Sequence, residues 1–106
     1  MITSLIPMGF EVVIEPAALQ DIQEAVNYYD LQAPGLGYKF EEELDHCFEV
    51  LENTQFFQIR YDETRCLPLK RFPYMIHYSV DEKNQTVIVR AVFNTSRNPK
   101  IWKSRE

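Results

Sequence analysis

The sequence predicts a single α+β domain, in which a short N-terminal strand precedes an antiparallel pair of helices packed on an antiparallel β-sheet. Three observations predict this fold class. Apolar residues recur at helical spacing across residues 16–51, and they alternate with other residues across residues 65–93. A segment with proline and glycine interrupts the helical pattern at residues 33–35. The length of 106 residues allows one hydrophobic core and not two.

The first half of the chain predicts the strand and both helices. Residues 10–14 alternate as in a short strand. Pro16 then stands where the first helical turn accepts a residue without an N–H. The second helix begins near Leu36 or Tyr38, and the short connection makes the two helices antiparallel neighbours. Their apolar stripes are Leu19, Ile22, Val26 and Tyr29 in the first helix, and Phe40, Leu44, Cys47, Phe48 and Leu51 in the second.

The second half predicts the sheet. Residues 65–71 are extended, and Pro68 restricts them to an edge or a bulge because proline donates no hydrogen bond. Residues 74–80 and 87–93 form a hairpin through a turn at 81–84. If Val80 pairs with Gln85, one face is apolar and meets the helices. On that face Tyr78 lies opposite Val87, Ile76 opposite Val89 and Tyr74 opposite Ala91. The other face is left uncovered. There Ser79 lies opposite Thr86, His77 opposite Ile88 and Met75 opposite Arg90.

The ends of the chain and its cysteines bear on its location. We expect residues 1–9 to be a disordered tail and residues 10–106 to be the domain, with Met8 as an alternative start of translation to Met1. The tail lacks the features of a signal peptide and is too short to span a bilayer. The cysteines, Cys47 and Cys66, show no redox or metal-binding spacing, so we expect a cytoplasmic protein.

The charge is distributed unevenly along the chain. Residues 1–56 carry eleven acids and one base, whereas residues 57–106 carry ten bases and five acids. The halves therefore differ in sign, although the net charge is −5. Either the basic half presents a positive surface to an anionic partner, or the two halves neutralise each other within the fold.

Four segments together resemble the RelE/ParE-like toxins of bacterial type II toxin–antitoxin systems, which include plasmid stabilisation proteins. The resemblance covers about residues 10–102. The segments are residues 16–22 (PAALQDI), residues 28–29 with 33–37 (YY and APGLG) followed by Phe40, residues 70–78 (KRFPYMIHY), and residues 92–99 (VFNTSRNP) with Trp102. The family implies a helical hairpin on a curved antiparallel sheet, and a toxin that a cognate antitoxin neutralises. ParE-like members poison DNA gyrase, and RelE-like members cut mRNA on the ribosome.

Two departures from the RelE-like pattern favour the ParE-like interpretation. Met75 stands where RelE-like nucleases place an arginine, and Asn94 stands where many members carry a histidine. A nuclease would have to use His77 as a general base, together with Tyr78, Arg90 and Arg97. Tyr74 is an alternative to Tyr78 in that constellation. The opposing interpretation of His77 is an ordinary strand histidine.

Seven residues are predicted to contact the target or the antitoxin: Arg65, Lys70, Arg71, Met75, Arg90, Asn94 and Arg97. The opposing interpretation is that their charges are solvated or pair with the acidic helices. Trp102 either anchors an interface or packs back on the sheet. We expect no metal, no cofactor, no small-molecule substrate and no membrane partner.

Three functions remain open from the sequence. The first is a toxin that inhibits a macromolecule such as DNA gyrase by binding it. The second is a ribosome-dependent mRNA endoribonuclease. The third is an inactive homologue that only binds its antitoxin.

Overall fold

A computed structural model describes residues 9–55, 59–61 and 63–95. The predicted tail therefore lies outside the described residues except for Gly9. Gly9 packs against the end of the second helix, where an added Cβ would lie 2.3 Å from the carbonyl oxygen of Glu52. Phe10 N–H also donates to that oxygen at 2.8 Å.

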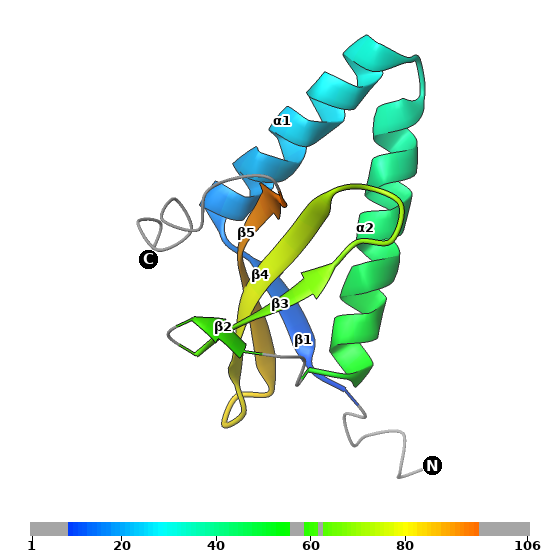
Figure 1. Cartoon of the computed structure of the whole chain (residues 1–106). Coiled ribbons are helices and arrows are strands. Elements are labelled where there is room, and N and C mark those ends of the chain that lie inside the picture. Colours follow the sequence, from blue (N-terminus) through cyan, green and yellow to red (C-terminus); the bar gives the residue numbers. More distant parts are fainter. Residues whose placement is uncertain (1–8, 56–58, 62, 96–106) are drawn as a thin grey trace, which may run out of the picture.

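The described residues form two helices and one five-stranded mixed sheet, with both helices on the same face (Figure 1). The strand order is β1-β5-β4-β3-β2. The elements are β1 (Glu11–Ile14), α1 (Pro16–Gln32), α2 (Leu36–Asn53), β2 (Ile59–Tyr61), β3 (Thr64–Pro68), β4 (Tyr74–Asp81) and β5 (Thr86–Asn94). The predicted α+β fold is confirmed. The antiparallel expectation holds for β2 to β5, whereas β1 pairs with β5 in parallel.

The corner between the helices depends on glycine and on one carboxylate. Gly35 has a φ of 84°, a left-handed conformation that ends the connection and that glycine adopts without strain. Gly37 lies in the first turn of α2, where an added Cβ would be 2.7 Å from the carbonyl oxygen of Val26. Asp30 of α1 accepts the N–H of Gly37 at 2.9 Å. The corner thus holds α1 and α2 in close antiparallel contact, as the sequence predicts.

The core lies between the helices and one face of the sheet. Phe40 is fully buried there, and its ring lies 5.3 Å from Phe72 and 5.1 Å from Tyr74. Tyr29 packs against the same three rings, and burial, followed by the nearby Tyr74 and Tyr28, raises the pKa of its hydroxyl. These aromatic contacts join both helices to the β3–β4 connection.

The predicted hairpin register is wrong by two residues. Val80 pairs with Val87 rather than with Gln85, because the last strand pair before the turn is Asp81 with Thr86. The Oδ1 atom of Asp81 accepts the N–H of Asn84 at 3.1 Å, and Gln85 adopts a positive φ of 50°. These local contacts fix the turn type, which strand alternation alone does not determine.

A β-bulge at Arg90 changes the faces of β5. Val89 pairs with Tyr78, whereas Ala91 pairs with His77, so Arg90 is an extra residue between them. Val92 consequently joins the core under the helices. Ala91, predicted to face Tyr74 on the helix side, instead lies on the opposite face together with Phe93.

The opposite face is also buried at this part of the sheet. Met75 is 8% exposed, His77 0% and Phe93 1%. The prediction that Met75 and His77 lie on an uncovered face is therefore wrong. A strand covered on both sides need not alternate between apolar and polar residues.

Candidate interaction site

Arg90 lies on the sheet face away from the helices. Its Nε atom donates to the hydroxyl of Ser79 at 2.9 Å, and Nη1 donates to Glu15 Oε2 at 3.1 Å. Ser79 neighbours Tyr78 on β4, and Tyr78 packs toward the helices, so Ser79 and its partner Arg90 lie on the other side. The side chain of Arg90 is 40% exposed. The guanidinium is thus held in place and remains reachable from solvent.

Two of the four residues predicted for catalysis, His77 and Tyr78, lie in the core. His77 is fully buried, with Nδ1 3.6 Å from the Sγ atom of Cys66 and its ring 5.2 Å from that of Phe93. Tyr78 is also fully buried, and its hydroxyl donates to the carbonyl oxygen of Gln55 at 2.8 Å. A general base must reach the proton that it removes. In this conformation neither side chain can contact an RNA on the surface.

The other predicted contact residues are spread over several places. Arg65 on β3 is half-buried and pairs with Tyr78 on β4. Asn94, at the end of β5, pairs with Tyr74 on β4. Met75 is buried, and Arg97 and Trp102 lie outside the described residues. The described members of the predicted set therefore do not form one surface patch, since Met75 is buried.

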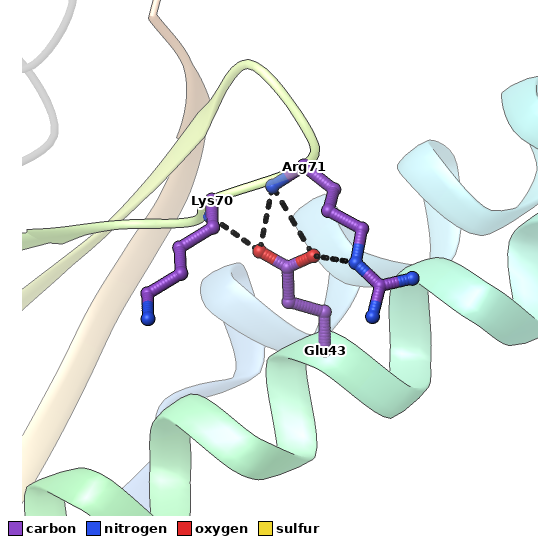
Figure 2. Close-up of polar contacts among 3 residues, drawn as sticks. All are labelled: Glu43, Lys70 and Arg71. Carbon is purple, nitrogen blue, oxygen red and sulfur yellow. Dashed lines mark hydrogen bonds and ion pairs between the residues drawn. The ribbon is translucent and has the colours of Figure 1, made fainter.

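Lys70 and Arg71 lie in the β3–β4 connection, where Glu43 of α2 binds their backbone (Figure 2). The Glu43 carboxylate accepts the N–H of Lys70, and it accepts the N–H of Arg71 at 3.0 and 3.2 Å. Arg71 Nε lies 3.9 Å from Oε1 of the same group. Glu43 is 12% exposed, whereas Arg71 is 83% exposed. The loop backbone is fixed while both cationic side chains stay at the surface.

Sequence reasoning missed Glu43, although a signal exists. Glu43 follows Phe40 by three residues and precedes Cys47 by four, so it belongs to the stripe of α2 that faces the sheet. A carboxylate at such a position needs hydrogen-bond donors from the layer it faces. The N–H groups of Lys70 and Arg71 supply them.

Next to Glu43, α2 and β3 enclose a groove of about 620 Å³, here called the α2–β3 groove. Cys47 is one of its lining residues, and burial, together with Glu43, raises the thiol pKa to about 11, while Lys70 offsets part of the effect. This thiol stays protonated near neutral pH and is a poor nucleophile. The lining residues are Lys39, Glu42, Glu43, His46, Cys47, Val50, Leu67, Pro68, Lys70 and Arg71.

The described residues contain neither a cluster suited to a metal ion nor a helix suited to a membrane. No group of three or more histidine, cysteine, aspartate or glutamate side chains is arranged to hold a metal ion in that part of the chain. Neither α1 nor α2 combines the length and apolar character needed to cross a membrane.

Comparison with solved structures shows the same fold in toxin–antitoxin proteins. A chain of the chromosomal ParDE system from P. aeruginosa superposes with a TM-score of 0.73 at 14% identity, covering 84% of this chain and 99% of that one. The isolated E. coli RelE toxin gives 0.60 at 18% identity, covering 90% and 94%. A chain of the RelBE2 toxin–antitoxin complex from Mycobacterium tuberculosis gives 0.57 at 16% identity, covering 85% and 95%.

Sequence comparisons give the family. A search of curated proteins finds no match. A sequence-family model matches residues 12–99, and it is described as the ParE toxin of the type II toxin–antitoxin system, parDE. The match includes every described helix and strand from α1 to β5. The resemblance drawn from the sequence is thereby confirmed, and the chain belongs to the ParE toxin family of type II toxin–antitoxin systems.

Proposed function

We propose that the chain is an active toxin that inhibits DNA gyrase by binding it, and that a cognate antitoxin neutralises it. Membership of the ParE family supports a toxin. The burial of His77 supports inhibition by binding, because the one histidine considered for proton transfer is enclosed beside Cys66 and Phe93. That burial is the single observation that carries the choice between the two mechanisms.

Arg90 is the residue on which we centre target binding. Its two hydrogen bonds, to Ser79 and Glu15, orient a partly exposed guanidinium on the face away from the helices. An oriented arginine gives up little conformational freedom on binding and presents several donors to an acidic surface. Both the target and the antitoxin in this proposal are cytoplasmic, so the chain acts in the cytoplasm.

Expression without the antitoxin tests the proposal in cells. In the culture we expect growth arrest with filamentous cells and induction of the DNA-damage response. With purified proteins we expect the chain to inhibit gyrase in a supercoiling assay. Rapid arrest of translation with cleaved mRNA would instead identify an endoribonuclease. An unimpaired culture, with a folded chain that still binds its antitoxin, would identify an inactive homologue.

The role of His77 can be tested separately. A His77→Gln variant keeps a polar side chain, and its folded fraction is measured by circular dichroism. At equal amounts of folded protein we expect inhibition of gyrase to equal that of the wild type. A loss of activity in a variant that folds fully would contradict the proposal that His77 serves the core.

A further inference from the structure

The α2–β3 groove is lined by charged residues and by three partly uncovered apolar residues, here called its floor: Val50, Leu67 and Pro68. We infer that this groove is the docking site of the antitoxin. It receives an amphipathic segment that places apolar side chains on the floor and carboxylates toward Lys70 and Arg71. The inference rests on the proposed function, since it requires that an antitoxin binds the chain.

The floor offers apolar surface that the fold leaves incompletely covered. Val50 of α2 and Leu67 of β3 are half-buried, and Pro68 is exposed. A volume of about 620 Å³ accommodates several side chains, and covering such surface is the main favourable term in association. The groove therefore suits apolar anchors on one side of a partner segment.

The backbone of β3 argues for docking through side chains rather than for addition of another strand. β2 pairs with β3 only as far as Arg65, so the Pro68 end of β3 is a sheet edge among the described strands. Proline presents no N–H at that edge, and the N–H of Leu69 already donates to Tyr74 at 2.9 Å. A strand added beside Pro68 would lack a donor there, whereas a helix or turn that inserts side chains needs none.

The two walls of the groove differ in charge. The strand side carries Lys70 and Arg71, whereas the α2 side carries two acids, Glu42 and Glu43, and one base, Lys39. The exposed face of α2 continues this negative charge, with Lys39 as its single base, through Glu41, Glu42, Asp45 and Glu49. A nucleic acid would be repelled by this helix, but a protein segment with acids on one edge and bases on the other matches both walls.

Glu43 acts in this site as a positioning residue. Figure 2 shows its carboxylate below the loop, with the side chains of Lys70 and Arg71 extending to either side of it. Because Glu43 binds both backbone N–H groups, the two cationic side chains start from fixed points. A preset loop loses less conformational freedom when the partner binds. The acid thus contributes to affinity without touching the partner.

The test measures binding of the antitoxin encoded beside the toxin gene by isothermal titration calorimetry. Groove variants are Val50→Glu and the double change Lys70→Glu, Arg71→Glu. Their matched controls are Leu31→Glu, at a residue that is 86% exposed on α1, and Lys83→Glu, in the β4–β5 turn. Each variant is checked for folding by circular dichroism and thermal unfolding.

We expect each groove variant to weaken binding by about tenfold or more, and the controls to bind like the wild type. We expect Glu43→Ala to weaken binding and Glu43→Gln to restore part of it, because glutamine keeps an acceptor oxygen. Folded groove variants with wild-type affinity, or controls that lose as much, would overturn the groove as docking site while leaving the proposed function intact. A wild-type chain that forms no complex would overturn both.

Discussion

The carboxylate of Asp21 on α1 accepts the backbone N–H of Val92 on β5 at 3.0 Å. β1 pairs with β5 only as far as Val89, so this part of β5 has no strand beside it on that edge among the described residues. Asp21 takes the place of a strand there and ties the first helix to the sheet. Pairing of a backbone group in this way satisfies a donor that would otherwise be costly to bury.

Replacing Asp21 with alanine therefore removes the acceptor of a backbone hydrogen bond. We expect Asp21→Ala to lower the free energy of unfolding by about 1–3 kcal/mol. Urea denaturation followed by circular dichroism measures the change. Glu24→Ala, at an exposed position nearby on the same helix, serves as the control and should be close to neutral.

Adding a methyl group at Gly37 should force the two helices apart. The new Cβ would lie 2.7 Å from the Val26 carbonyl oxygen and 2.8 Å from Asp30 Oδ1. We expect Gly37→Ala to destabilise the fold by about 1–3 kcal/mol, although alanine favours helix more than glycine does. Thermal unfolding measures the loss of stability, and Tyr38→Ala, at an exposed neighbouring position, is the control. A stabilised Gly37→Ala protein would show that the helices do not approach this closely.

Alkaline pH should weaken the fold through Cys47. Burial raises the thiol pKa to about 11 in the folded protein, so between about pH 9 and 11 the unfolded chain has lost a proton that the folded one retains. The free energy of unfolding must then fall as the pH rises through this range. Urea titrations at pH 8 and pH 10.5 measure the fall, and it should be smaller in Cys47→Ala. Because Tyr29 also has a raised pKa, Tyr29→Phe separates the two contributions.

Arg90 should matter more for activity than for stability. Its ion pair with Glu15 joins two side chains that are each 40% exposed, and such pairs contribute about 0.2–1 kcal/mol. We expect Arg90→Ala to remain folded and to inhibit gyrase weakly, as measured by the supercoiling assay. Lys83→Ala is the matched control for loss of one positive charge. Full activity of Arg90→Ala would remove this residue from the target contact.

The sequence predicted the helices well because their apolar stripes and the break at residues 33–35 are local signals. The pairing of the strands was harder. Residues 87–93 are apolar except for Arg90, so alternation could not show that Arg90 is an extra residue. The bulge then moved Ala91 to the face opposite to the predicted one. The parallel pairing of β1 is likewise invisible to periodicity, which gives a strand but not its partner.

The candidate site was predictable only in part. Lys70 and Arg71 were identified from their charge, and the structure keeps both at the surface. Their partner Glu43 lies 27 residues before Lys70, and contacts at such separations depend on how the layers pack. His77 was misplaced for the same reason, since a polar residue in a strand looks exposed until both faces of the sheet are known to be covered.

The pairing of Glu11 with Thr86 joins segments that lie 75 residues apart in the sequence. During synthesis β1 emerges from the ribosome well before its partner strand β5. The helices and the hairpin can form early from neighbouring segments, but closing this long loop waits for β5 and costs chain entropy. A polypeptide that stops before residue 86 therefore lacks β5, the strand with which Val12 and Ile14 of β1 pair.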